Sequence, residues 1–124
     1  MAKKVLVVED DTIVQKTIIE SLKDAGFDVS GAFDGEEGLA KAATVMPDLI
    51  LLDIIMPKMD GIAFLRKIKT VEDLKNIPII ILTNLSDEES VSESLASGGT
   101  EYLVKSNYTI DEVVQKVKAR FGME

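Results

Sequence analysis

The feature that most constrains the fold is a regular alternation between short apolar runs and longer amphipathic stretches. The apolar runs have the length of β-strands and read KVLVV, FDVSGA, DLILLD, IPIIILT and EYLVK in chain order. After the first run, apolar residues recur at helical intervals at Val14, Ile18, Leu22 and Ala25, and Gly26 follows as a helix-ending residue. Strands buried on both faces and separated by helices are typical of repeated βα units around a parallel sheet.

Local patterns predict where the later helices begin. A capping residue followed three positions later by glutamate is typical of a helix start. Three such pairs occur: Asp34 with Glu37, Ser86 with Glu89, and Thr109 with Glu112. A further helix is expected from about Gly61 to Lys69, because the preceding MPKMDG contains the turn residues Pro57, Asp60 and Gly61.

Five βα units in 124 residues predict one α/β domain, residues 1–124, with no effector domain. The expected architecture is an open, doubly wound, five-stranded parallel sheet in the order 2-1-3-4-5, since a closed eightfold barrel needs about twice this length. Ligands of such sheets bind beyond the carboxyl ends of the strands, where the strand order reverses. The residues at these ends are therefore the candidate site.

Composition excludes several kinds of chemistry. The chain has no cysteine and no histidine, so reactions within it depend on carboxylates, hydroxyls, lysines and backbone groups. With 22 acidic and 14 basic residues the net charge is −8, and no basic cluster is interleaved with aromatics, so no direct nucleic-acid binding is expected. No apolar run approaches the roughly 18 residues of a membrane span, and the N-terminus lacks the pattern of a secretory leader. We expect a cytoplasmic protein.

Acidic residues follow two strands that are neighbours in the predicted order. Glu9, Asp10 and Asp11 come after the first strand, and Asp53 ends the third. We therefore expect Asp10, Asp11 and Asp53 to converge. Carboxylates this close repel one another unless a cation lies among them. Mg²⁺ suits the site, because it prefers oxygen ligands and keeps part of its hydration shell.

The ends of the fourth and fifth strands carry groups suited to a phosphoryl group. Thr83 offers a hydroxyl donor and Lys105 a compact positive charge. Without histidine or cysteine, attack by a carboxylate on phosphorus is the plausible covalent route. Asp53 is the expected nucleophile, because it ends the most apolar strand at the centre of the sheet, whereas Asp10 and Asp11 lie on a loop.

Taken together, VLVVEDD, DLILLDIIMPKMDG, IIILT and YLVK resemble, in order and spacing, the response-regulator receiver domains of two-component signalling. The resemblance covers about residues 4–121 and implies a flavodoxin-like (βα)5 fold. It implies that Asp53 is the phosphoacceptor. It also implies that Asp10, Asp11 and Asp53 bind Mg²⁺ together with the backbone carbonyl of Ile55.

The same resemblance implies a signalling switch rather than an enzyme. Thr83 and Lys105 would bind the phosphoryl group, and Tyr102 would change rotamer as Thr83 moves. The face formed by the fourth helix, fifth strand and fifth helix would change with it. The implied partners are a histidine kinase or histidine phosphotransfer protein and a downstream protein target, with the chain a monomer or a weak phosphorylation-dependent dimer. Glu9 receives no role.

Several alternatives stay open at this point. Asp11 could cap the helix that starts at Thr12, with or without binding a metal, and Tyr102 could be an ordinary half-buried strand aromatic. The whole chain could be a magnesium-dependent phosphatase or phosphotransferase that uses an aspartyl phosphate, or a receiver-like protein that binds partners without phosphorylation.

Two residues depart from the family pattern. Ser106 follows Lys105 where the family usually has proline in a cis peptide bond, and Asn84 follows Thr83 where the family favours a small residue. A cis bond before serine costs about 2.5–4 kcal/mol. We therefore expect a trans bond between Lys105 and Ser106.

Overall fold

Strands and helices alternate along the chain, as the sequence predicts. The computed structural model describes residues 2–56 and 59–123, so Pro57 of the predicted turn lies outside the described residues. In chain order the elements are β1 (Lys4–Val8), α1 (Thr12–Asp24), β2 (Asp28–Ala32), α2 (Gly35–Val45), β3 (Leu49–Leu52), α3 (Gly61–Ile68), β4 (Ile79–Thr83), α4 (Glu88–Ala96), β5 (Glu101–Val104), a short 3-10 helix (Lys105–Asn107) and α5 (Ile110–Arg120).

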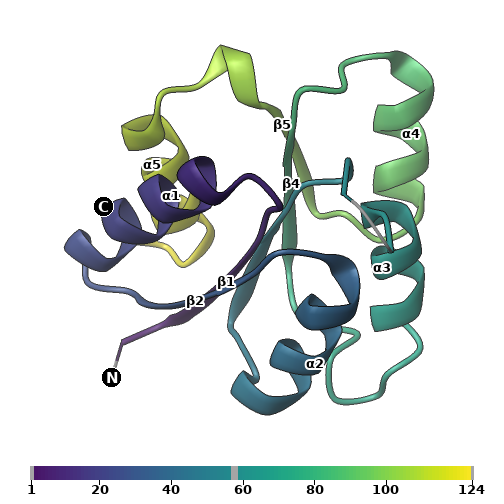
Figure 1. The fold of residues 1–124 in the computed structure, drawn as a ribbon, viewed down its shortest axis with the longest axis horizontal. Helices are drawn as coiled ribbons and strands as arrows, with labels where there is room; N and C mark the ends of the chain where they lie inside the picture. The colour runs from purple at the N-terminus through teal and green to yellow at the C-terminus, as the bar shows by residue number, and fades with distance from the viewer. Residues whose placement is uncertain (1, 57–58, 124) are drawn as a thin grey trace.

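The five strands form one parallel sheet in the order β2-β1-β3-β4-β5, which confirms the predicted topology. Residue Val8 of β1 pairs with Leu52 of β3, and Thr83 of β4 pairs with Val104 of β5. Helices α1 and α5 cover one face of the sheet, and α2, α3 and α4 cover the other (Figure 1). The carboxyl ends of β1 and β3 are therefore adjacent at the point where the strand order reverses.

The core consists of two apolar layers, one on each side of the sheet. Successive residues of β1 point to opposite faces. Val5 and Val7 belong to the cluster shared with α1 and α5, whereas Leu6 and Val8 belong to the cluster shared with α2 and α3. All four are at most 1% exposed. Because burial of one such side chain stabilises the fold by about 1.5–3 kcal/mol, the central strands are the firmest support available to a site.

Side-chain caps fix most helix starts where the sequence predicts them. Asp34 accepts a hydrogen bond from the Glu37 amide at the start of α2, and Thr109 forms a capping box with Glu112 at the start of α5. The predicted cap at Ser86 is wrong. Asp87 caps α4 instead, because its carboxylate accepts a hydrogen bond from the Ser90 amide.

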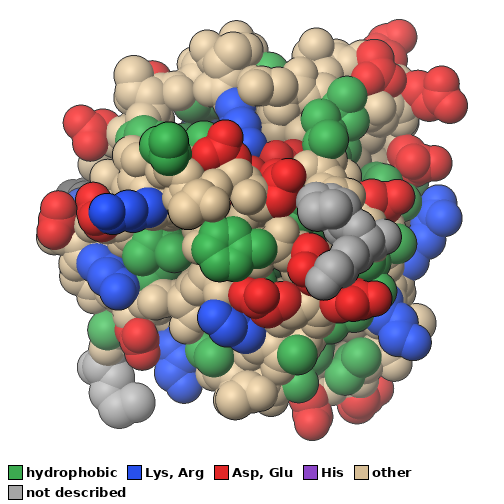
Figure 2. All heavy atoms as spheres, in the orientation of Figure 1, with side chains coloured by type: hydrophobic (Ala, Val, Ile, Leu, Met, Phe, Trp, Pro, Cys, Tyr) green, Lys and Arg blue, Asp and Glu red, His purple; other side chains and the backbone are tan. Residues whose placement is uncertain are grey.

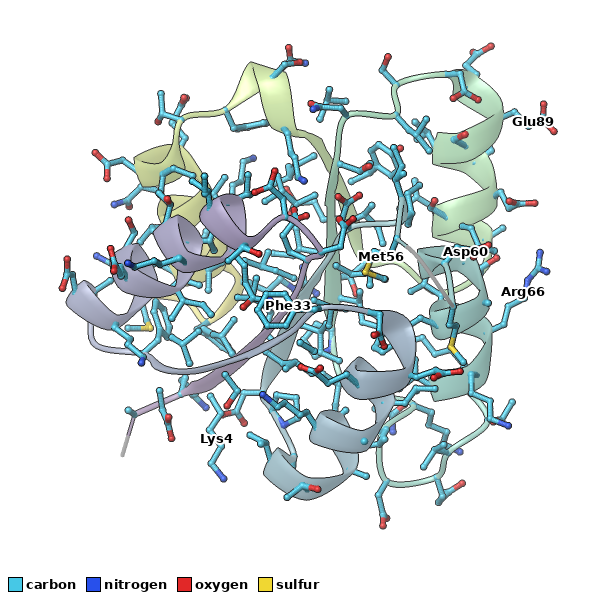
Figure 3. All side chains as sticks on the ribbon, viewed as in Figure 1. Lys4, Phe33, Met56, Asp60, Arg66 and Glu89 are labelled. Atoms are coloured by element: carbon cyan, nitrogen blue, oxygen red, sulfur yellow. The ribbon has the colours of Figure 1, made fainter. Side chains whose placement is uncertain are left out.

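Charged side chains occupy the outer surfaces of the helices. Figure 3 shows Arg66 of α3 and Glu89 of α4 extending away from the sheet. Arg66 lies 3.8 Å from Glu93, and both side chains are more than half exposed. Exposed pairs of this kind contribute at most about 1 kcal/mol, so the two apolar layers dominate the stability. Within residues 2–56 and 59–123, every helix is too short or too polar to cross a bilayer.

Candidate functional site

Three carboxylates lie together at the carboxyl end of the sheet. Ligand oxygens of Glu9, Asp10 and Asp53 are all within 4.8 Å of one another. Glu9 and Asp53 are the first residues after β1 and β3, and the last paired residues of these strands are Val8 and Leu52. The register therefore brings the next residue of each strand side by side. Figure 2, in the same orientation as Figure 1, shows acidic side chains near the upper centre of the view, with a basic side chain beside them.

Lys105 connects the two buried carboxylates. It follows β5, and its Nζ donates to Oδ2 of Asp53 at 2.8 Å and to Oε1 of Glu9. Burial raises the pKa of Glu9, against the lowering effect of its hydrogen bonds to Lys105 and to the Asp11 amide. Burial also opposes the charge of Lys105, but its hydrogen bonds to Asp53 and Glu9 outweigh this and raise its pKa. The ammonium is therefore charged at neutral pH.

Backbone groups hold both buried carboxylates in place. The Asp11 amide donates to Oε2 of Glu9 at 3.0 Å, and the Ile55 amide donates to Oδ1 of Asp53 at 3.0 Å. The buried amide of Gln15 donates to the backbone carbonyl of Glu9 at 3.0 Å, which ties α1 to the end of β1. Glu9 and Asp53 are 3% and 6% exposed. Their orientation is fixed by hydrogen bonds from several elements.

The acids expected to converge with Asp53 are Asp10 and Asp11, but the structure brings Glu9 and Asp10 together with it. Glu9 joins Asp10 and Asp53 in the cluster, and Asp11 does not. Oδ1 of Asp11 accepts hydrogen bonds from the amides of Ile13 and Val14, each at 3.0 Å, so this side chain caps α1. Capping directs the carboxylate toward the helix, which is the competing role that the sequence left open.

Sequence reasoning missed Glu9, although one feature points to it. Glu9 and Asp53 occupy the same position relative to their strands, one residue beyond the last apolar residue. In neighbouring parallel strands these two positions lie side by side when the last residues of the strands pair with each other, as Val8 and Leu52 do. Counting outward from each strand would have selected Glu9 before Asp11.

The residues of the cluster fit a hard divalent cation. Three acids cluster here and one ammonium group is bonded to two of them, so acidic groups outnumber basic ones at the cluster. Two of the three acids are buried, where uncompensated charge is costly. The donor set consists of oxygen atoms alone, which suits Mg²⁺ and excludes a thiolate or imidazole metal centre.

The predicted phosphoryl-binding and switch residues lie on the β4 and β5 side of the site. Thr83 ends β4 and is fully buried, and among the described residues its Oγ1 has no hydrogen-bond partner. Tyr102 of β5 is half-buried, and its hydroxyl donates to the Leu85 carbonyl at 2.6 Å. Burial, followed by the charges of Asp87 and Asp53, raises the pKa of Tyr102. Its hydroxyl is therefore a donor at neutral pH.

The chain after Lys105 forms a 3-10 turn, Lys105–Asn107. The described residues contain no cis peptide bond, so the predicted trans bond between Lys105 and Ser106 is confirmed. The backbone amide of Ser106 donates to Oδ1 of Asn84 at 3.1 Å. The two positions that depart from the receiver pattern therefore contact each other.

Comparison with known proteins gives a consistent match over the whole fold. The family model described as the response regulator receiver domain matches residues 5–118. The alkaline phosphatase synthesis transcriptional regulatory protein PhoP of Bacillus subtilis is 38% identical over 119 residues, covering 96% of this chain and 48% of that protein. The dual master transcriptional regulator RpaA of Synechocystis is 33% identical over 116 residues, covering 94% and 48%. The chain thus spans about half the length of these relatives.

Solved structures agree in fold and length. The chemotaxis protein CheY4 of Vibrio cholerae superimposes with a TM-score of 0.89 at 33% identity, covering 96% of this chain and 98% of that one. A CheY-like receiver domain protein of Methanospirillum hungatei has a TM-score of 0.90 at 28% identity, covering 98% and 95%.

Proposed function

Because the chain belongs to the response regulator receiver domain family, we propose that it accepts a phosphoryl group on Asp53. The observation that carries the proposal is the environment of the Asp53 carboxylate. Asp53 is buried at the centre of the sheet, bonded to Lys105 at 2.8 Å, and clustered with two other acids. The donor would be a phosphohistidine on a histidine kinase or histidine phosphotransfer protein.

The transfer exchanges one bond to phosphorus for another. A carboxylate oxygen of Asp53 forms a bond to phosphorus while the bond from phosphorus to the donor imidazole nitrogen breaks, and that nitrogen keeps the electron pair. Negative charge on the phosphoryl oxygens has to be stabilised as they pass between the two groups. The ammonium of Lys105, already directed at Asp53, is placed to provide this stabilisation.

Three carboxylates would hold a metal ion beside the acceptor. Glu9, Asp10 and Asp53 supply the oxygen ligands, and the resemblance adds the backbone carbonyl of Ile55. When bound, Mg²⁺ would supply positive charge to the phosphoryl oxygens. Asp11 remains a helix cap in this proposal and is not a ligand.

The product acts as a switch by offering new acceptor oxygens at Asp53. The buried Thr83 hydroxyl has no partner among the described residues and can donate to such an oxygen. If Thr83 moves toward Asp53, the Leu85 carbonyl that accepts from Tyr102 moves with it, and Tyr102 changes its position. The face formed by α4, β5 and α5 then differs between the two states, and a downstream protein target would read that difference.

Incubation with Mg²⁺ and a small acyl phosphate donor tests the proposal. Intact-mass measurement should show the gain of one phosphoryl group, and Asp53→Asn should abolish it. Asp73→Asn, which alters an exposed carboxylate between α3 and β4, is the matched control and should retain the gain. Consumption of many donor molecules per protein would favour a phosphatase or phosphotransferase instead. Complete absence of labelling would favour a receiver-like protein that works without phosphorylation.

A further inference from the structure

One hydrogen bond joins the loop after β4 to the 3-10 helix after β5. The Ser106 amide donates to Oδ1 of Asn84 at 3.1 Å. This bond requires both residues as they stand, because proline has no amide hydrogen to donate and a small apolar side chain has no oxygen to accept. We call the Asn84–Ser106 hydrogen bond the loop strap.

The loop strap joins the chain segments that carry the two phosphoryl-binding candidates. Pairing of β4 with β5 ends at Thr83 and Val104. Asn84 comes directly after Thr83, and Ser106 directly after Lys105. The strap thus extends the link between the two strands beyond the last backbone pair. It connects the residue that follows Thr83 with the residue that follows Lys105.

A second bond restrains the same segment. The Tyr102 hydroxyl donates to the carbonyl of Leu85 at 2.6 Å. The two residues that follow Thr83 are therefore each bonded to the β5 side of the site, one through a side-chain oxygen and one through a backbone oxygen. If residues 83–85 move relative to β5, both bonds have to stretch or break, unless Tyr102 and Ser106 move in the same direction.

We propose that the loop strap opposes the movement of Thr83 toward a phosphoryl group on Asp53, so that Asn84 and Ser106 set how easily the protein switches. This inference rests on the proposed function. The Thr83 hydroxyl is fully buried and has no partner among the described residues. A shift of residues 83–85 toward Asp53 would offer it an acceptor oxygen, and the loop strap would resist that shift. Asn84 and Ser106 are exposed, so water can replace the strap and its net contribution is small. The strap therefore adjusts the switching equilibrium without locking it.

Equilibrium binding of trifluoroberyllate with Mg²⁺ tests the proposal, because this anion resembles a phosphoryl group on a carboxylate. Asn84→Ala should bind it about two- to fivefold more tightly than the unmodified protein, the range expected for one exposed hydrogen bond. Ser106→Pro should have the same effect while keeping the Asn84 side chain, which separates the bond from side-chain bulk. Ser106→Ala keeps the amide donor and is the matched control with unchanged affinity.

The double variant gives a sharper result. Because both single changes remove the same bond, Asn84→Ala combined with Ser106→Pro should bind no more tightly than either alone. Effects that add would contradict the strap. Hydrogen exchange of the Ser106 amide provides a readout that does not depend on binding. Exchange should be faster in Asn84→Ala than in the unmodified protein.

The possible failures are distinguishable. Trifluoroberyllate binding with the same affinity in the unmodified protein and Asn84→Ala, or weaker binding in the variant, would overturn the strap alone. Absence of binding in the unmodified protein would overturn the proposed function, and this regulatory role with it. Unchanged exchange of the Ser106 amide in Asn84→Ala would show that the bond does not protect it, and would also overturn the inference. Asn84 is exposed, so this variant keeps the test independent of whether Ser106→Pro folds.

Discussion

The two halves of the site differ in how fully their buried polar side chains are bonded. In the half formed by β1 and β3, all four carboxylate oxygens of Glu9 and Asp53 accept hydrogen bonds. In the half formed by β4 and β5, the Thr83 hydroxyl has no partner within the part of the chain that the structure describes. Two bonds there run from the loop after β4, one to Tyr102 of β5 and one to Ser106 of the turn that follows β5.

This difference assigns different tasks to the two halves. Carboxylates that are already oriented need little rearrangement before they bind an ion or attack phosphorus. Such preorganisation lowers the free-energy cost of stabilising the charge that develops in the transition state. A segment with an unbonded hydroxyl and exposed loop contacts can instead adopt a second arrangement at a small cost in free energy. The β1 and β3 half is suited to chemistry, and the β4 and β5 half to conformational change.

The largest expected effect comes from the residue that joins the halves. Lys105→Met removes the ammonium between Glu9 and Asp53, and the rate of Asp53 phosphorylation by a small donor should fall by about 100-fold or more, as when other preorganised donors are deleted. Time-resolved intact-mass measurement gives the rate. Lys116→Met is the control, since Lys116 lies on α5 in a half-exposed pair with Glu101. An unchanged rate in Lys105→Met would show that the halves act independently.

An effect of intermediate size, on Mg²⁺ affinity, distinguishes Glu9 from Asp11 in the β1 and β3 half. Glu9→Gln should weaken Mg²⁺ binding by about tenfold or more, because a buried carboxylate of the cluster is lost. Asp11→Ala should leave Mg²⁺ affinity nearly unchanged, because the backbone amide that orients Glu9 is retained. Calorimetric titration measures both. Equal losses in the two variants would restore Asp11 as a ligand.

The smallest effect concerns stability. Asp11→Ala removes the cap of α1 and should lower the free energy of unfolding by about 1 kcal/mol. Urea denaturation measures this difference. Glu9→Gln serves as the comparison, since it leaves the cap intact. If Asp11→Ala unfolds like the unmodified protein, the two amide bonds to Asp11 contribute nothing, and its side chain is free for another role.

The sequence predicted the parts of the site that depend on strand order. Asp53, Thr83 and Lys105 each follow or end a strand, and a parallel sheet brings such ends to one edge. It did not predict which of three consecutive acids faces that edge, because this depends on the register between β1 and β3 and on the competing demand of the α1 cap. Ser86 failed as a predicted cap for a similar reason, since adjacent Ser86 and Asp87 both have the right chemistry and the tertiary fold selects one. The loop strap is a long-range contact that no local pattern contains.

The Thr83 hydroxyl also has a thermodynamic consequence for the resting protein. A buried hydroxyl that lacks a partner lowers the stability of the folded state by about 1–3 kcal/mol. An arriving ligand oxygen that accepts from this hydroxyl recovers the missing free energy, which adds to the affinity for the ligand. Under the proposed function, stability and response to phosphorylation would therefore compete at this one side chain.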